Sequence, residues 1–452
     1  NVTINSSTSR LSGVQNMNVN IADNTADLTA LGFQDMRVLT LQGAGSGSSV
    51  LMNDVSGSGN NMTLTMTGLA GGFSAANIHN VSGNLTLVAT DMTGTIDIGR
   101  IDHGGSGVVQ VQGGTLGNFS AGVVHSAGRF TLDASANTEG TASVAFGTFS
   151  ASGAVNIALG SGSGDFSLGT VEAESTFDVD GTSFKGTMDV TTFTAGGATT
   201  FVMGTDGDFS AGTIGTAGAF KLVGESATSG EVSITTLSAG GGITVSMGTG
   251  SGDVALSAVT TGGGFVLNAP NFAGRLDTTT VTASGNVTVV TGSLGDFSAA
   301  DIQTAGKLTV DGSKGVTGQI TLTGASAAND MTVQMGAGTG AVAVVAGTTG
   351  GKFTLDASLF NGTMNVGTVT ASGAVAVSVG PKGQFSANDI ATQGKFDIDA
   401  GASTSGNIIL NSVTAGGNLS IAMGTGTGGL TLTDGFAAGK ISIDATKFGG
   451  TV

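Results

Sequence analysis

The chain has 452 residues, of which 81 are Gly, 39% are hydrophobic and only 10% are charged, and it contains no Cys, Trp or Tyr. The lack of Cys excludes disulfides, thiol catalysis and thiolate metal sites. The net charge of −17 argues against nucleic acid as a partner, because nucleic acid requires a basic surface. No apolar run is long enough for membrane insertion. The hydrophobic residues are frequent and regularly spaced, so we expect a folded core rather than disorder.

Residues 1–48 are the least regular part of the sequence. The stretches "NVTI" and "MRVLTL" resemble strands, because apolar and polar residues alternate in them. We therefore expect residues 1–48 to form less regular coils that continue into the fold of residues 49–452, as one elongated domain. Both ends of the sequence look like the interior of a fold, and we expect the chain to be a segment of a longer polypeptide.

From residue 49 to residue 452 the sequence repeats about every 22 residues. The copies are loose at first and become regular from Asp208, and every fourth copy is the most similar. Asp208, Asp296 and Gln384 begin three such related copies, so the superperiod is 88 residues. Repeats of this length indicate a solenoid or a similar array.

Each unit has the same pattern, with apolar residues at positions 2, 4, 7, 13 and 15. In unit 231–252 these are Val232, Ile234, Leu237, Ile243 and Val245. Alternation at positions 2/4 and 13/15 predicts two strands, each with one buried face. One such unit is too small to bury its own apolar face, so the units must stack on one another. The sequence predicts an all-β parallel β-helix (β-solenoid) of about 18–20 coils that rise about 4.8 Å each, with right-handed winding.

The glycine-rich stretch "MGTGSGD" (247–253) closes a unit and recurs in related forms along the chain. A phosphate-binding loop would need "GK[ST]" followed by a helix, and neither is present. We interpret the stretch as a corner of the coil, in which Gly supplies a positive φ without a steric clash.

Acidic residues recur at the first position of successive units, as Asp208, Glu231 and Asp253. Stacked coils would place these carboxylates about 5 Å apart, where like charges repel. Two interpretations are open. The three residues form a solvated acidic edge that Arg275, the next residue of the column, relieves, or they bind Ca2+, which prefers oxygen ligands.

The chain has only three histidines, His79, His103 and His125. Their alignment places them at one corner of three successive coils, with Asp102 beside them. Neutral imidazoles in that arrangement could hold a transition metal. The simpler interpretation is three polar side chains on an exposed turn.

Enzymes that cleave polysaccharides also use parallel β-helices, with aromatic platforms and long irregular loops. This chain has no Trp or Tyr, and its units differ in length by only one or two residues. We therefore expect no catalytic activity, and a polysaccharide-active enzyme is the least favoured alternative.

The low charge, the lack of Cys and strands such as "TVTASGNVTV" (280–289) make the chain similar to large surface-layer and adhesin-type secreted proteins of Gram-negative bacteria, many of which use type I secretion. The resemblance implies a non-catalytic structural protein at the cell surface or outside the cell, with Ca2+ as the candidate cofactor. It also implies self-association into a layer or filament, laterally or end to end, with cell-surface polysaccharide as a second candidate partner. The alternative is the rigid stalk of an adhesin that presents distal receptor- or glycan-binding domains.

Overall fold

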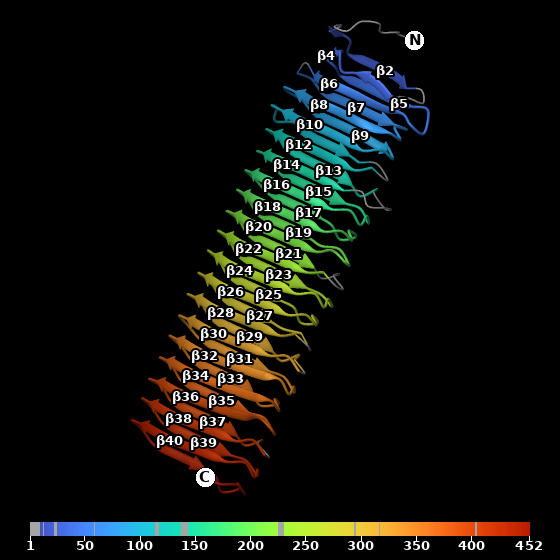
Figure 1. Ribbon diagram of the computed structural model, residues 1–452. Coiled ribbons are helices and arrows are strands. Elements are labelled where there is room, and N and C mark those ends of the chain that lie inside the picture. Colours follow the sequence, from blue (N-terminus) through green and yellow to red (C-terminus); the bar gives the residue numbers. More distant parts are fainter. Residues whose placement is uncertain are drawn as a thin grey trace. The chain divides into compact units, whose positions relative to one another are not determined.

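The computed structural model describes residues 10–11, 13–21, 25–57, 59–113, 117–136, 143–224, 230–292, 295–315, 317–402 and 405–452. The regular structure of these residues is entirely β, with no helix among them. They form about 18 turns of a parallel β-solenoid with a repeat of about 22 residues, which confirms the predicted fold class. The handedness stays a prediction. The chain divides into two compact units, Asn1–Val223 (unit 1) and Gly224–Val452 (unit 2), and each is described by itself (Figure 1).

Unit 1 has two sheets of parallel strands, one strand of each sheet per coil. The strands of its sheet A are β1 (Arg10–Leu11), β3 (Thr25–Leu28), β4 (Gly32–Phe33), β6 (Ser49–Gly57), β8 (Gly72–Asn80), β10 (Ile96–His103), β12 (Phe119–Ser126), β14 (Val144–Ala151), β16 (Phe166–Ala173), β18 (Met188–Ala195) and β20 (Phe209–Thr216). The strands of its sheet B are β2 (Asn16–Ile21), β5 (Val38–Gly43), β7 (Met62–Thr67), β9 (Leu85–Asp91), β11 (Val108–Gln112), β13 (Arg129–Ala134), β15 (Val155–Leu159), β17 (Phe177–Asp180), β19 (Thr199–Val202) and β21 (Phe220–Gly224).

The first coils of unit 1 are less regular than the later ones. Strands β3 and β4 both pair with β6, so two short strands occupy the place that one strand of eight or nine residues takes in the coils from β6 onward. From β8 onward each strand of sheet A pairs in parallel with the equivalent strand of the next coil, for example Ile96 with Phe119.

Unit 2 repeats this arrangement with more uniform coils. The strands of its sheet A are β22 (Val232–Ala239), β24 (Val254–Thr261), β26 (Leu276–Ala283), β28 (Phe297–Thr304), β30 (Ile320–Ala327), β32 (Ala341–Thr349), β34 (Thr363–Ala371), β36 (Gln384–Thr392), β38 (Ile408–Ala415) and β40 (Leu430–Ala437). The strands of its sheet B are β23 (Ile243–Met247), β25 (Phe265–Asn268), β27 (Val287–Val290), β29 (Leu308–Gly312), β31 (Met331–Met335), β33 (Phe353–Ala357), β35 (Val375–Val379), β37 (Phe396–Ala400), β39 (Leu419–Met423) and β41 (Ile441–Asp444).

The apolar positions of the repeat lie inside the coil, as the pattern predicts. In β22, Val232, Ile234 and Leu237 are buried, and the two adjacent residues Thr235 and Thr236 both face outward. The pairing register passes over Thr235 in β22 and Ser257 in β24 alike, so both strands have one unpaired residue at the centre and the register does not shift. This residue is the reason that the apolar spacing changes from two to three between positions 4 and 7.

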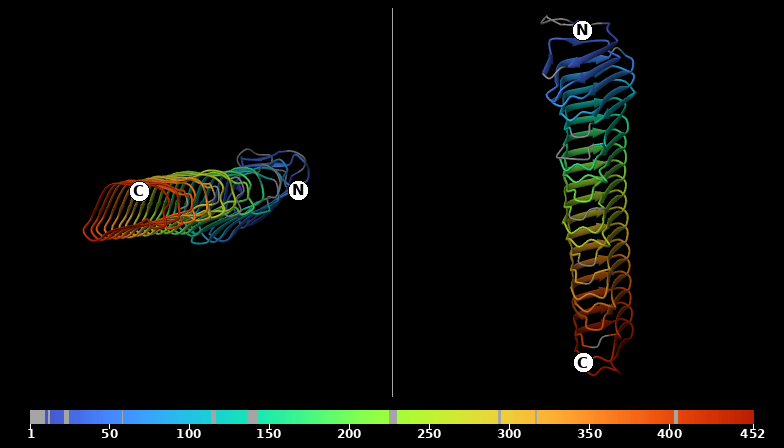
Figure 2. Two further views of the ribbon diagram at one scale, coloured as in Figure 1. Left: turned by 90° about the horizontal axis from the view of Figure 1, so that it is seen from below. Right: turned by 90° about the vertical axis from the view of Figure 1, so that its right-hand side faces the viewer.

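The 88-residue superperiod is visible in the segments that close the coils. Three buried phenylalanines, Phe184, Phe272 and Phe360, lie in these closing segments, and successive members are 88 residues apart. The "MGTGSGD" type of closing segment recurs at the same interval, beginning at Leu159, Met247, Met335 and Met423. Every fourth coil therefore has the same closing segment. Figure 2 shows the connecting segments of successive coils stacked along unit 2.

The predicted role of Gly in the closing bends is wrong in its mechanism. Among the described residues, Gly with positive φ occurs at Gly13, Gly59, Gly68, Gly72 and Gly83, none of them in the "MGTGSGD" segments. The closing bends need Gly because the coils approach closely. A Cβ on Gly274 would overlap the carbonyl oxygen of Gly252 in the preceding coil, and a Cβ on Gly362 would overlap that of Gly340.

Candidate functional site

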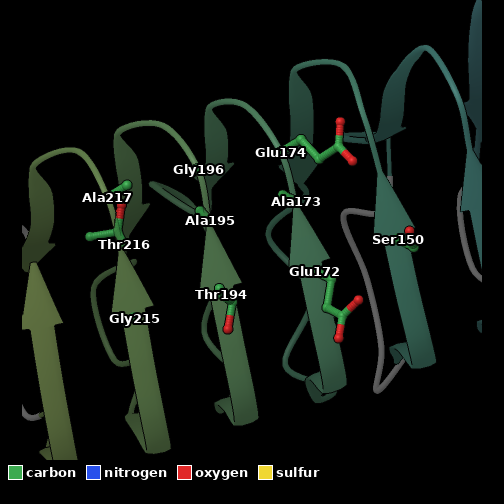
Figure 3. Close-up of a pocket in the computed structure, with 10 residues that line it drawn as sticks. All are labelled: Ser150, Glu172, Ala173, Glu174, Thr194, Ala195, Gly196, Gly215, Thr216 and Ala217. Carbon is green, nitrogen blue, oxygen red and sulfur yellow. The ribbon is translucent and has the colours of Figure 1, made fainter. Parts of the chain in front are cut away.

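A surface hollow lies in unit 1, at the corner where the strands of sheet A end (Figure 3). It is an open groove of about 610 Å3 that crosses four successive coils. Its lining residues are Ser150, Glu172, Ala173, Glu174, Thr194, Ala195, Gly196, Gly215, Thr216 and Ala217. Glu172 and Glu174 are the charged members and are exposed, and small residues in the next two coils leave room beside them. Carboxylate and hydroxyl oxygens can bind cations or form hydrogen bonds to a hydroxyl-rich ligand.

Sequence reasoning missed this groove. The signal was present in "VEAES" (171–175), where two Glu side chains flank a buried Ala in one corner. The repeat places the acidic residues of the predicted Ca2+ site at position 1 of each unit, whereas the residues that line the groove lie at positions 8–10.

The groove continues a column of outward-facing side chains that includes two of the histidines. The strand register aligns His79, Asp102, His125, Ser150 and Glu172 in successive coils. His79 Nδ1 lies 3.6 Å from Asp102 Oδ2, and Arg100 donates a hydrogen bond of 3.2 Å to the same oxygen. The structure therefore brings His79 and Asp102 together, and His125 is the neighbour of Asp102 in the next coil.

His103 does not share this surface, so the interpretation of all three histidines as exposed is wrong for it. It lies one residue after Asp102 and therefore points into the coil, where it is 0% exposed between Asn80 and Ser126 of the adjacent coils. Its Nε2 lies 2.8 Å from the carbonyl oxygen of Gly83 in the preceding coil, so the tautomer with a proton on Nε2 fits this contact. Nδ1 of His103 and Oδ1 of Asn80 are both buried without a protein partner.

No group of three His, Asp or Glu side chains within the described ranges is placed to hold a metal ion. A site built from His79, Asp102, His103 and His125 would have to reach both faces of a strand. The transition-metal site stays a prediction.

The acidic column is divided between the units. Asp208 precedes β20 in unit 1, whereas Glu231 and Asp253 precede β22 and β24 in unit 2 and occupy adjacent coils. Arg275 follows them in the column, as predicted, and Nε of its guanidinium lies 2.7 Å from Asp277 Oδ2. The Ca2+ site at Asp208, Glu231 and Asp253 stays a prediction.

The carboxylates of this column have a structural role that the sequence did not reveal. Oδ1 of Asp253 accepts the backbone N–H of Arg275 (3.3 Å), and Oδ1 of Asp296 accepts that of Gln319 (2.7 Å). Each acceptor lies one coil before its donor and in the same column. Asn407 makes the same contact with Gly429, so a neutral amide oxygen serves as the acceptor here as well as a carboxylate does. We call these contacts acceptor ladders.

A second acceptor ladder precedes the strands of sheet B. Oδ1 of Asn286, Asp330 and Asn418 accepts the backbone N–H of Lys307, Lys352 and Lys440, respectively, at 2.9–3.0 Å. Two N–H donors of Lys352 and Lys307 hold the pKa of Asp330 below its usual value, with the backbone N–H of Lys352 as the largest cause. Three carboxylates of unit 2, those of Asp253, Asp296 and Asp330, therefore link the corners of adjacent coils as hydrogen-bond acceptors.

Comparison of the chain with protein-family models, with curated proteins and with solved structures returned no match. Within the described ranges, the structure has no helix of the length and apolar character that a bilayer span requires.

Proposed function

We propose that the chain is a non-catalytic structural protein of the bacterial cell surface or extracellular matrix. In this proposal the β-solenoid associates with further copies, laterally or end to end, into a layer or fibre. The observation that supports it is the regularity of the outward columns. In unit 2 the coils keep one pairing register from β22 to β40, so each outward position recurs about every 4.8 Å.

Repetition of this kind suits contacts that are individually weak and collectively strong, because multiple contacts between tethered sites raise the effective affinity. Most outward positions of sheet A carry Ser, Thr, Ala or Gly, for example Ser233, Thr235, Thr236 and Ser238 in β22. Such small side chains lose little conformational entropy when another surface covers them.

Electron microscopy of the native material tests the proposal. A periodic sheet or filament containing this chain is the expected result. Isolated molecules at every concentration and salt condition would contradict it. Imaging with and without a chelator also tests the predicted Ca2+, because an assembly that depends on Ca2+ disperses when the ion is removed.

A polysaccharide-binding adhesin is the second candidate, and the groove of unit 1 is the observation that favours it. Glu172, Glu174 and Thr194 provide oxygens that could accept hydrogen bonds from sugar hydroxyls. Under this alternative, Glu172→Ala combined with Glu174→Ala abolishes binding to a glycan array, whereas Glu231→Ala, outside the groove, leaves it unchanged.

A further inference from the structure

The outward face of sheet B in unit 2 has a charge pattern that neither the acidic column nor the groove explains. Alternate residues of a strand point to opposite sides of the sheet. In β33, Phe353 and Leu355 are buried, so Lys352, Thr354 and Asp356 share the outward face. Three outward columns therefore run from coil to coil: one just before each strand, one at its second residue and one at its fourth.

The first column has a Lys in every second coil. These residues are Lys307, Lys352, Lys395 and Lys440, all exposed. The coils between them carry Asp330, Ala374 and Asn418, and backbone hydrogen bonds fix the order, as from Met331 N–H to Lys352 O. We call these four residues the Lys row. Its members are about 9.6 Å apart, because each coil rises about 4.8 Å.

The third column has an Asp in the same coils as the lysines. Its charged members, the Asp row, are Asp311, Asp356, Asp399 and Asp444, separated in the pairing register by Gln334, Ser378 and Ala422. Oδ1 of each Asp accepts a backbone N–H two residues further on, which fixes the carboxylate at the end of its strand. The two rows lie about 13 Å apart, since four residues of a strand span that length.

Between the rows lies a strip of mostly small, partly buried side chains that includes Thr309, Thr332, Thr354 and Ala376. Two lysines also make contacts within the chain, Lys307 to Asp330 (3.1 Å) and Lys395 to Asp397 (2.5 Å). Both lysines are about 60% exposed, and ion pairs at such surfaces contribute only about 0–1 kcal/mol. The lysines of the row can therefore leave these weak ion pairs and pair with carboxylates of a second molecule.

We propose that this face binds the same face of a second copy, with the two solenoids parallel and related by a two-fold axis along the stacking direction. This rotation reverses the direction of the strands and preserves the order of the coils. It therefore places the Lys row of each copy opposite the Asp row of the other, in the same coil. A two-fold axis along the strands would instead place Lys on Lys and Asp on Asp, which repel. The inference rests on the proposed function, since it names the surface that assembles.

The size of the face indicates how strongly one pair associates. From β29 to β41 the strip is about 29 Å long and about 13 Å wide, or roughly 400 Å2 per partner, from the spacings of strands and coils. Stable dimers usually bury about 800 Å2 per partner. A single pair is therefore weak, and the contact suits copies that are already concentrated in a layer, where repeated contacts add.

Single-cysteine variants test the geometry directly, because the chain has no Cys of its own. Thr309→Cys and Ser420→Cys lie in the central column, five coils apart by the pairing register. With a short bis-maleimide, each variant crosslinks to itself in the parallel arrangement, and an equal mixture gives no Thr309–Ser420 product. A mixture that gives only this mixed product would overturn the parallel arrangement in favour of an antiparallel one.

Charge reversal tests the contribution of the rows. The triple variant changes Lys352, Lys395 and Lys440 of the Lys row to Glu. The matched control changes Lys314, Lys382 and Lys447, which lie in the closing segments, to Glu. Both variants also contain Ser420→Cys. Both variants change the net charge equally. We expect self-crosslinking to fall at least about tenfold in the first, because like charges now oppose each other, and to stay unchanged in the control.

Equal crosslinking in both variants would overturn the inference, once circular dichroism has shown that both are folded. Periodic assemblies in electron micrographs without crosslinking at Thr309→Cys or Ser420→Cys would overturn this surface and leave the proposed function standing. If neither assemblies nor crosslinks form, the proposed function fails as well.

Discussion

Unit 1 and unit 2 form the same type of coil but differ in the side chains that fill its core. In unit 1 phenylalanines contact one another between coils and within a coil, for example Phe177 and Phe193 of adjacent coils at 4.8 Å and 83°, and Phe193 and Phe201 of one coil at 5.7 Å. Within the described ranges, all ring-to-ring contacts lie between Phe119 and Phe220. In unit 2 the same columns are mainly aliphatic, with Leu237, Val259 and Val281 in the place of Phe193.

The units also differ at the inward residue that ends each strand of sheet A. In unit 2 this position alternates between Ala and a buried Thr, namely Thr261, Thr304, Thr349 and Thr392. Each of these Thr hydroxyls donates to a carbonyl oxygen of the preceding coil, as Thr304 does to Gly285. In the first coils of unit 1, Asn80, His103 and Ser126 occupy the equivalent position. The later coils of unit 1 have Ala151, Ala173 and Ala195 there, and then Thr216, whose hydroxyl donates to the carbonyl oxygen of Gly197 as the Thr residues of unit 2 do. The corner thus accepts several side chains, provided that they are small or carry a donor for the carbonyl.

This difference indicates that the repeat fixes the backbone geometry of the coil and the inward positions more strictly than the residue type at each position. Unit 1 derives cohesion from aromatic contacts, which add about 0.5–1.5 kcal/mol per pair beyond burial. Unit 2 combines smaller apolar side chains with a hydrogen bond at every second corner. Because each coil contacts only its neighbours, a change in either unit should act locally, and amide hydrogen exchange is the suitable measurement.

The largest effect is expected from Phe193→Ala in unit 1. Phe193 is 0% exposed and contacts the rings of Phe177 and Phe201, and removal of a buried Phe costs about 3–5 kcal/mol. Amide exchange in β18 and the adjacent strands should accelerate accordingly. Val259→Ala, at the equivalent place in unit 2, should have a smaller effect because it removes fewer buried atoms. Equal effects in the two units would contradict the aromatic basis of the difference.

The next effect is expected from Thr304→Val in unit 2. The change preserves the shape of the side chain but leaves the carbonyl oxygen of Gly285 without its hydroxyl partner, at a cost of about 1–3 kcal/mol. It also removes the acceptor of the Gly306 N–H (3.0 Å), whose exchange should accelerate most. Thr309→Val, on the outward face, makes the same chemical change where water can replace the hydroxyl. A loss of protection as large in Thr309→Val would show that β propensity, and not the hydrogen bond, is responsible.

The coil could be predicted from the sequence because its signal is repeated many times. Apolar residues at positions 2, 4 and 7 recur from unit to unit. An exception in one unit therefore does not obscure the pattern, because the other units show which positions face inward. The corners could not be predicted, since there a single residue decides which way a side chain points. His103 lies one residue after Asp102, and that one step moves it from the surface to the interior.

The acceptor ladders are a second case in which the sequence alone does not show the role of a residue at a corner. An Asp at position 1 is equally consistent with a Ca2+ ligand, a solvated charge and an acceptor for a backbone N–H. Only the coil geometry, which places the N–H of Arg275 next to Asp253, distinguishes the last of these. The superperiod of 88 residues was predictable from Asp208 and Asp296, but its physical basis in Phe184 and Phe272 required the closing segments to be placed in space.

A comparable or smaller effect is expected at the histidines of unit 1. His103→Ala removes a buried side chain that contacts Gly83 O, so we expect a loss of about 1–3 kcal/mol. His125→Ala, on the exposed column, should change stability by no more than about 0.5 kcal/mol. Zinc titration of both variants also tests the predicted metal site. Zinc binding that is lost in His125→Ala and also in a folded His103→Ala would support the site and contradict the inward role of His103.

A small effect is expected from Asp253→Asn in unit 2. The amide oxygen of Asn can accept the backbone N–H of Arg275 as the carboxylate does, because Asn407 makes the same contact with Gly429. Stability without added calcium should therefore change by no more than about 0.5 kcal/mol. A calcium titration separates the two roles. If the predicted Ca2+ site exists, calcium stabilises the wild-type chain and not the variant.

The smallest effect on stability is expected in the acceptor ladder of sheet B. In unit 1 the acceptors are the amide oxygens of Asn61 and Asn84, whereas in unit 2 one acceptor is the carboxylate of Asp330. The backbone N–H of Lys352, and after it the side-chain ammonium of Lys307, lower the pKa of Asp330, so its folded pKa lies below the unfolded value of about 3.9. Its contribution is complete above about pH 4 and is lost as the pH falls through the folded pKa. Protonation of the carboxylate weakens its contact with the Lys352 N–H.

Exchange of individual amides by NMR between about pH 2 and pH 5, around the unfolded value, measures this loss. Protection of the Lys352 N–H should decrease on acidification, relative to Lys307 and Lys440, whose acceptors are the non-titrating Asn286 and Asn418. Asp330→Asn should make the three amides respond alike. If Lys352 loses no more protection than the other two in the wild-type chain, the charge of Asp330 does not contribute to this corner. The difference between the Asn ladder of unit 1 and the mixed ladder of unit 2 would then have no energetic consequence.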